Sequence, residues 1–278
     1  PVVSAFYKIR RHIRQGIVEL IGNGEAEFIA VGFVGIHVFR VGMVVPEHPV
    51  ALLMQGQTVL SRPRLQHGKG VIFRPFSKVG VAGHFHGGQL PDDLDIRIFF
   101  SKKRYELIAS GCYWLSEEPT IAGSISWQTN RARHVNWVRV LDRKTGKQMR
   151  FIDVHLDHKS PLAKVNQAKL IVREAAQYQQ AFPQILCGDF NSGKTEEQVV
   201  HFTENGWTDW YDTLHNGVEF GRTAHGFMGE NHPRKGRRID YILTKGGAKA
   251  LSCEVITDHR GELYPSDHYF MLAEIIVE

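Results

Sequence analysis

Beyond about residue 92, short apolar runs alternate with polar residues at the period of two that is typical of β-strands. Residues 95–116 read DIRIFFSKKRYELIASGCYWLS and predict two strands joined by a turn. Residues 134–156 read HVNWVRVLDRKTGKQMRFIDVHL and predict a hairpin whose turn contains Gly146. Two further strands are predicted at 238–244 and 270–278, so this part of the chain reads as a sheet with intervening helices.

Helical spacing occurs in two places between these strands. From 160 to 181 the apolar positions recur every three or four residues, and Ser160 stands at the cap position. Pro183 ends this helix, and a strand is predicted at 184–187. A second, shorter helix is predicted at 195–205. This order of elements predicts an α/β fold, in which a mixed sheet carries helices on its outer faces.

The first 90 residues differ in composition from the rest. They contain no Asp and no Trp, whereas the remainder holds all twelve Asp and all five Trp. They carry ten Lys/Arg against four Asp/Glu, while residues 91–278 carry 24 against 25. The basic excess of the chain therefore belongs to its first third, and it does not indicate that the remainder binds nucleic acid.

The composition disfavours two further classes of protein. Cys112, Cys187 and Cys253 are too few and too scattered for a disulfide framework or a zinc site, and we expect all three to be buried. No apolar run reaches about 18 residues, so no transmembrane helix is expected. We expect a soluble protein, either cytoplasmic or secreted after removal of a leader, and the sequence does not indicate its oligomeric state.

Polar residues stand at the ends of four predicted strands. In QILCGDFNS, residues 184–192, an apolar run meets Gly188 and is followed by a carboxylate and an amide on either side of Phe190. Phe190 can point back toward the core while its two neighbours point outward. A rigid sheet can aim side chains at its strand ends toward one point. The set comprises His155, Asp189, Asn191, Asp240, Asp267 and His268.

These residue types fit metal-assisted hydrolysis of a phosphate ester. The carboxylates of Asp189 and Asp267 are hard ligands that suit Mg²⁺ or Mn²⁺. A histidine paired with an aspartate can act as acid or base near neutral pH, and Asp240 can orient either His155 or His268. Taken singly, each motif also fits a capping turn or a strand end, but all four in this order favour one shared site.

Four of these motifs resemble, in order, those of the endonuclease/exonuclease/phosphatase superfamily, which has the DNase I-like fold. The matching stretches are VHLDH, CGDFNS, RRIDYILT and SDHYFMLAEI, and further similarities are WLSEEP, RHVNW and RTAHGF. The resemblance covers about residues 92–278. It implies a four-layer α/β sandwich and a phosphoesterase that depends on Mg²⁺ or Mn²⁺.

The resemblance also implies a role for each matching residue. His155 would act on the phosphate or the leaving group, Asp189 would orient or activate the attacking water, and Asn191 would help to hold the phosphate. Four further residues are assigned in the same way. The resemblance places Asp240 as the partner of a histidine, Asp267 near the metal, and His268 and Arg133 against the phosphate; as a residue at a strand start, Arg133 also fits a surface charge.

The first 91 residues lack the two motifs that the family carries in its N-terminal half. These are a strand that ends in Asn and a strand that ends in Gln-Glu, whose Glu is the main metal ligand. Glu47, after the apolar run VGMVV, is the nearest substitute. Two interpretations stay open: residues 1–91 are either a diverged half of the sandwich or a stretch read in the wrong frame, joined to a family-like region at 92–278.

The leading interpretation of function is a metal-dependent hydrolase of a phosphodiester in a small molecule, a lipid-linked group or a nucleic acid. The near-neutral charge of residues 91–278 disfavours an enzyme of duplex DNA, although the cluster HPRKGRR at 232–238 keeps nucleic acid open. We therefore favour a small or lipid-linked phosphodiester. The alternative is a degenerate family member that binds without hydrolysing, because the metal Glu and the Asn motif are missing.

Overall fold

The computed structural model describes residues 29–32, 51–54, 79–82, 97–129, 131–259, 261–264 and 266–278. Glu47, the substitute metal ligand suggested by the sequence, lies outside these residues. Within the first 91 residues three short strands are described: β1 (Ile29–Gly32), β2 (Ala51–Met54) and β3 (Val79–Ala82).

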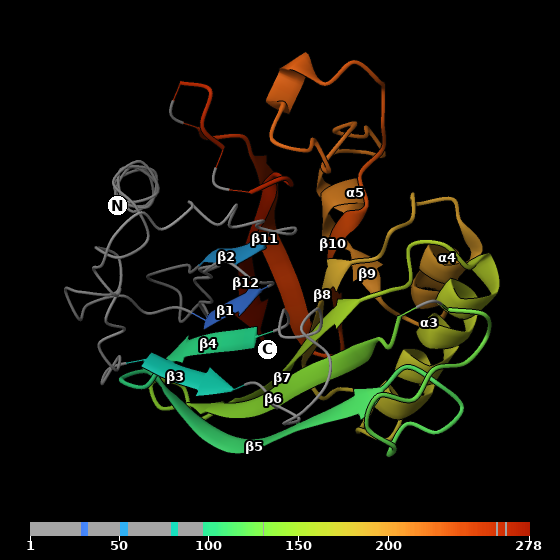
Figure 1. Cartoon of the computed structure of the whole chain (residues 1–278). Helices are drawn as coiled ribbons and strands as arrows, with labels where there is room; N and C mark the ends of the chain where they lie inside the picture. Colours follow the sequence, from blue (N-terminus) through green and yellow to red (C-terminus); the bar gives the residue numbers. More distant parts are fainter. Residues whose placement is uncertain are drawn as a thin grey trace, which may run out of the picture.

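The largest sheet has six strands in the order β5-β6-β7-β8-β10-β9 (Figure 1). Its strands are β5 (Tyr105–Trp114), β6 (His134–Asp142), β7 (Gln148–His155), β8 (Gln184–Asp189), β9 (Thr208–Asp209) and β10 (Asp240–Lys245). β7 and β8 run parallel, because α3 connects them, and the other neighbours in this sheet pair antiparallel. The predicted hairpin is therefore confirmed as β6 and β7.

Two three-stranded sheets lie against one face of the large sheet (Figure 1). One has the order β1-β4-β3 and contains β4 (Arg97–Ser101). The other has the order β11-β12-β2 and contains β11 (Ala248–Ile256) and β12 (Phe270–Val277). The described strands of the first 91 residues thus pair with the later part of the chain: β1 and β3 lie on either side of β4, and β2 pairs with β12.

Helices cover the opposite face of the large sheet. They are α3 (Pro161–Ala175) and α4 (Glu197–Glu204), while α5 (Trp210–Leu214) and the short 3₁₀ helix η1 (Gly229–Asn231) lie in the connection to β10 (Figure 1). The predicted α/β fold, a mixed sheet with helices on its outer side, is confirmed. In the described part of the chain, no helix is both long enough and apolar enough to cross a membrane.

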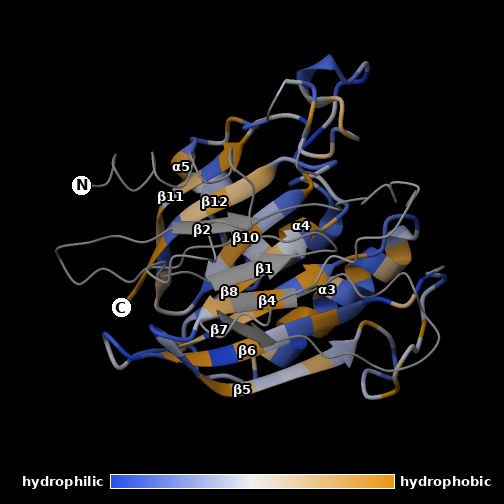
Figure 2. Cartoon of the chain, turned by 60° about the vertical axis from the view of Figure 1, so that its left-hand side comes forward, coloured by the Kyte–Doolittle hydropathy of each residue, from blue (hydrophilic) through white to orange (hydrophobic). Residues whose placement is uncertain are grey.

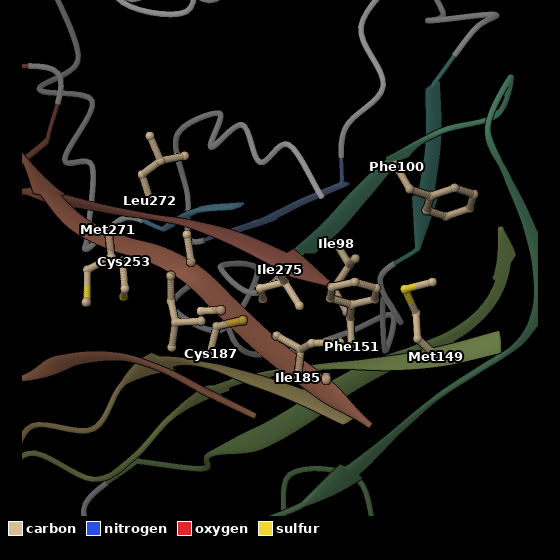
Figure 3. Packing of buried hydrophobic residues seen from close by; sticks show 14 of the residues in the cluster. Ile98, Phe100, Met149, Phe151, Ile185, Cys187, Cys253, Met271, Leu272 and Ile275 are labelled. Atoms are coloured by element: carbon tan, nitrogen blue, oxygen red, sulfur yellow. The ribbon is translucent and has the colours of Figure 1, made fainter. Parts of the chain in front are cut away.

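Two hydrophobic cores flank the large sheet, so its central strands are buried on both faces. Figure 3 shows the core between this sheet and the smaller ones, where Phe151 and Ile185 meet Ile98 and Ile275. Ile152 and its neighbours form the other core with α3 and α4. Figure 2 shows the apolar stretches along these strands and the mixed polar and apolar surface of α3. A strand that is apolar on both faces is typical of the centre of a layered fold.

Three details differ from the sequence predictions. The first predicted helix ends at Ala175 rather than near 181, because the buried positions of α3 stop there and turns follow. Strand β11 was not predicted, since the charged Lys249 and Glu254 interrupt its apolar pattern. Cys187 and Cys253 are buried as expected, but Cys112 is only half-buried because β5 is an edge strand.

Gly188 allows β7 and β8 to approach each other just before the polar ends of these strands. It pairs with Val154 in the parallel ladder and has a φ of +155°. A Cβ atom at this position would lie 1.7 Å from the carbonyl oxygen of Val154, which is too close for any contact. The glycine is therefore required by the approach of the neighbouring backbone.

We expect Gly188→Ala to lower the free energy of unfolding by roughly 2–4 kcal/mol, because the two strands must separate to admit the methyl group. Gly146→Ala is the matched control, since Gly146 has a φ of +70° with no atom within 4 Å of the added Cβ. This control should cost only about 1–2 kcal/mol of left-handed strain. Urea unfolding checks both, and equal losses for the two variants would contradict the steric argument.

Asp153 is a carboxyl group buried inside the core between the sheets. It lies on β7 between Phe151 and His155, with Asn136 and Cys187 beside it on the neighbouring strands. Its Oδ2 atom has no hydrogen-bond partner among the described residues. Burial raises the pKa of Asp153 well above its usual value, and a hydrogen bond from the backbone of Val154 offsets this only in part.

This raised pKa predicts how stability depends on pH. A group whose pKa is raised on folding contributes its full stability below the unfolded pKa of about 3.9, and loses it as the pH rises toward the folded value. Asp153→Asn cannot ionise, so the variant should be about as stable as the wild type at pH 4. At pH 8 it should be more stable by roughly 1–3 kcal/mol. Denaturation at both pH values checks this, and a difference that does not change with pH would refute it.

Candidate active site

Three strands of the large sheet bring polar side chains to one place. β7 ends at His155, β8 ends at Asp189 and β10 begins at Asp240. The strand registers pair Asp189 with His155 on one side and with Asp240 on the other. Like Cys187 two residues earlier in β8, Asp189 lies on the face that looks toward the smaller sheets. The predicted convergence of these strand ends is therefore present.

Asp240 and His268 form the closest pair in the site. His268 comes from the segment just before β12, and its Nδ1 lies 3.1 Å and 3.0 Å from the two carboxylate oxygens of Asp240. Asp240 is fully buried and His268 is 7% exposed. Of the two partners that the sequence left open for Asp240, the structure selects His268.

The charge of Asp240 governs the protonation of His268. Burial by itself lowers the pKa of the imidazole, but the carboxylate of Asp240, with those of Asp189 and Asp267, outweighs it and raises the pKa to about 10. At neutral pH His268 is thus a cation whose Nδ1–H donates to Asp240. Its other nitrogen, Nε2, then carries a second proton.

Asp189 and His155 are neighbours whose pKa values are shifted in opposite directions. Burial and the nearby charge of Asp240 raise the pKa of Asp189 to about 7. Burial, together with the positive charges of Arg133 and His268, holds the pKa of His155 well below its usual range. His155 Nε2 lies 3.5 Å from Asp189 Oδ2, but the imidazole is neutral, so this contact is not an ion pair. The site therefore holds a neutral imidazole, a carboxyl that titrates near neutrality and an imidazolium.

The turn after β8 has an unusual backbone that positions Asp189. Asn191 has a φ of +50°, and its backbone N–H donates to Asp189 Oδ1 at 2.7 Å. The side-chain amide of Asn191 donates to the carbonyl of Leu156 at 3.0 Å and so joins the ends of β7 and β8. Phe190 is fully buried and stacks on Tyr241 at 4.8 Å, as expected for a residue that points back into the core.

A buried lysine supports this turn from α3. Lys164 is 7% exposed, and its Nζ donates to the carbonyl of Asn191 at 3.1 Å and to Glu196 at 3.2 Å. Glu196 also accepts from the backbone of Gly193 at 2.8 Å and pairs with Arg237 at 2.6 Å. Neither Lys164 nor Glu196 is among the residues predicted for the site, although a lysine on the buried face of a helix is a sequence signal for such a network.

Arg133 is 6% exposed, so it is not a solvated charge at the start of a strand. Its Nη2 lies 3.4 Å from His158 Nδ1, and its charge acts on both His155 and Asp189. Asp157, in the same VHLDH motif, serves a different purpose. Its carboxylate accepts hydrogen bonds from Thr129 Oγ1 and the backbone of Ser160 at 2.7 Å each, which ties two loops together beside the site.

Asp189, Asp240 and His268 form a cluster of possible metal ligands, whose ligand atoms lie within 4.8 Å of one another. Because both ring nitrogens of the protonated His268 carry a proton, only the two carboxylates can bind a cation in this state. Two carboxylates fit a hard dication such as Mg²⁺ or Mn²⁺, although Asp240 is already engaged with His268. Asp267, the residue predicted to lie near the metal, is adjacent in sequence but does not belong to this cluster of the described residues. Burial raises the pKa of its half-exposed carboxyl, and its backbone carbonyl accepts from His225 and Gly226.

Solved structures share this arrangement of elements. The chain is 26% identical to an endonuclease/exonuclease/phosphatase from Bacteroides vulgatus, with a TM-score of 0.64 over 72% of this chain and 77% of that one. It is 25% identical to the mannosyl-6-phosphatase Bt3783 of Bacteroides thetaiotaomicron, with a TM-score of 0.59 over 66% and 72%. The human Nocturnin catalytic domain, 20% identical, shares the fold with a TM-score of 0.55 over 72% and 73%.

The family comparison agrees with the motifs and extends beyond them. No curated protein matches the sequence. The sequence model of the endonuclease/exonuclease/phosphatase family matches residues 32–268, which includes part of the segment before residue 92 that the motifs do not cover. This range is most of the 278 residues, and the predicted resemblance and the DNase I-like α/β fold are confirmed. The chain belongs to the endonuclease/exonuclease/phosphatase family.

Proposed function

We propose that the chain is a divalent-metal-dependent hydrolase of a phosphodiester. Family membership supports phosphoesterase or nuclease activity in the broad sense. The observation that carries the narrower proposal is the Asp240–His268 pair next to Asp189, because it places a fixed cation beside a carboxyl with a pKa of about 7. A phosphate ester needs both a base for the attacking water and a positive charge for its oxygens.

Each protein group has a distinct part in this scheme. Asp189, deprotonated in about half of the molecules near pH 7, orients a water and accepts its proton. His268 keeps its Nδ1–H on Asp240 and donates from Nε2 to a phosphoryl oxygen, where negative charge grows. Neutral His155 is placed to hydrogen-bond the phosphate or the leaving oxygen, and Arg133 adds positive charge on the same side.

Asp189 and Asp240, which lie in one cluster, are the carboxylates that would hold a divalent cation, and their oxygen donors favour Mg²⁺ or Mn²⁺. Asp267, which the motifs place near the metal, is a further candidate ligand next to His268 in the chain. Such an ion would neutralise phosphoryl charge and lower the pKa of bound water. The substrate that we favour is a small or lipid-linked phosphodiester. The similarity to a mannosyl-6-phosphatase supports a small, sugar-sized ester as the substrate. It also makes a phosphomonoester the first alternative substrate to test beside the phosphodiester.

The direct test is hydrolysis of bis(p-nitrophenyl) phosphate, beside p-nitrophenyl phosphate, with Mg²⁺, with Mn²⁺ and with EDTA. We expect turnover of the diester that EDTA abolishes and added Mg²⁺ restores. Asp189→Ala should lower kcat by roughly 10²–10⁴-fold, because the water loses its base.

Asp212→Asn is the matched control for loss of an acidic group. Asp212 lies on α5, where its carboxylate pairs with Lys194 Nζ at 2.6 Å. It takes no part in the site, so this variant should retain wild-type turnover. Turnover that survives EDTA, or that Asp189→Ala leaves unchanged, would exclude the proposal. Binding of inorganic phosphate without any turnover would instead support the degenerate, non-catalytic alternative.

A further inference from the structure

The segment that carries Asp267 and His268 is held along its length by the loop 223–229. The backbone N–H groups of His225 and Gly226 both donate to the carbonyl of Asp267, at 2.7 Å and 2.8 Å. Ala224 forms a β-bridge with His268, and the N–H of Tyr269 donates to the carbonyl of Thr223 at 2.9 Å. The position of the His268 backbone, and hence of its imidazole, therefore depends on the shape of this loop.

The ring of His225 lies inside the loop. It is 1% exposed and packs against Tyr269 and Tyr264, with ring centroids 4.1 Å and 4.7 Å away. Its Nδ1 accepts a hydrogen bond of 3.1 Å from the backbone N–H of Gly229. Because Nδ1 is the acceptor, the proton of the neutral ring is on Nε2. Nε2 is buried and has no hydrogen-bond partner of standard geometry among the described residues.

The loop needs this support because its backbone is strained. Gly226, Phe227 and Gly229 have φ values of +57°, +63° and +54°. The left-handed conformation costs a residue with a side chain about 1–2 kcal/mol, so Phe227 does not adopt it without compensating contacts. The hydrogen bond from Gly229 to the His225 ring closes the turn around Phe227, and the N–H of Met228 donates to the carbonyl of His225 at 3.0 Å.

We propose that His225 is a positioning residue, whose ring nitrogen Nδ1 keeps the loop 223–229 in the shape that places His268 against Asp240. His225 acts on the backbone that carries His268, through the hydrogen bond from its N–H to the carbonyl of Asp267 and through the bridge between Ala224 and His268. The inference rests on the proposed function for its effect on catalysis, while the effect on the loop can be measured without any substrate.

Two substitutions distinguish the contribution of the aromatic ring from that of its acceptor atom Nδ1. His225→Phe keeps an aromatic ring between Tyr264 and Tyr269 but removes the acceptor for Gly229. His225→Asn loses the ring but offers a carbonyl oxygen close to the position of Nδ1. His201→Phe, at a partly exposed position of α4 outside the loop 223–229, is the matched control for replacing a histidine by phenylalanine.

We expect His225→Phe to lower kcat on bis(p-nitrophenyl) phosphate by roughly 10- to 100-fold with KM within about 3-fold, because small misplacement of a reacting group costs rate. His225→Asn should retain kcat within about 5-fold of the wild type, and His201→Phe should match the wild type. Hydrogen–deuterium exchange should show faster exchange of the peptide that spans 225–229 in His225→Phe, with the peptide of α3 unchanged.

Several results would overturn the inference. A folded His225→Phe variant with wild-type kcat does so, even if exchange in the loop increases, because the role is then purely structural. A His225→Asn variant whose kcat falls by more than 10-fold also overturns the inference, because the carbonyl oxygen then does not replace Nδ1. If His225→Phe fails to fold, the result for His225→Asn alone tests the inference. If the wild type shows no metal-dependent turnover, the proposed function fails. The role of His225 is then tested separately by hydrogen–deuterium exchange, and unchanged exchange at 225–229 in a folded His225→Phe variant refutes it.

Discussion

The ion pair between Asp240 and His268 is the interaction on which the rest of the site depends. Asp240 is fully buried at the start of a strand in the large sheet, where an uncompensated carboxylate would be very costly. His268 precedes a strand of one of the smaller sheets. The pair therefore joins the two sides of the sandwich at the edge where the polar strand ends meet. Removing His268 would leave the carboxylate of Asp240 buried without its partner, at a cost of roughly 3–5 kcal/mol.

This pair also sets the protonation of its neighbours. The carboxylate of Asp240 makes His268 a cation. Burial, together with the charge of Asp240, raises the pKa of Asp189 to about 7. Burial, together with the positive charges of Arg133 and His268, keeps His155 neutral. Different environments thus assign different charges to two histidines and two aspartates within one cluster, which is the usual way in which a site separates its acid from its base.

Much of this site could be predicted from the sequence because it lies where strands end. Asp189 and Asp240 interrupt apolar runs, and the order of the motifs places them on neighbouring strands. The position of Lys164 on the buried face of a predicted helix marks it as unusual, but its partner could not be predicted. The partner of His225 could not be predicted either, since both residues bind backbone groups that become their neighbours only in the folded chain. Strand β11 was missed because exposed residues such as Lys249 and Glu254 interrupt its apolar pattern, and its pairing with β12 exists only in the folded chain.

The account is tested most directly by the pKa of His268, which NMR titration of the imidazole can measure in the wild type and in Asp240→Asn. We expect the wild-type ring to stay protonated up to pH 9 and to titrate at about 10. In Asp240→Asn the pKa should fall toward the ordinary value of about 6.5, because burial is then opposed only by the more distant carboxylates. A wild-type His268 that titrates near 6.5 would contradict the central claim that Asp240 holds it as a cation.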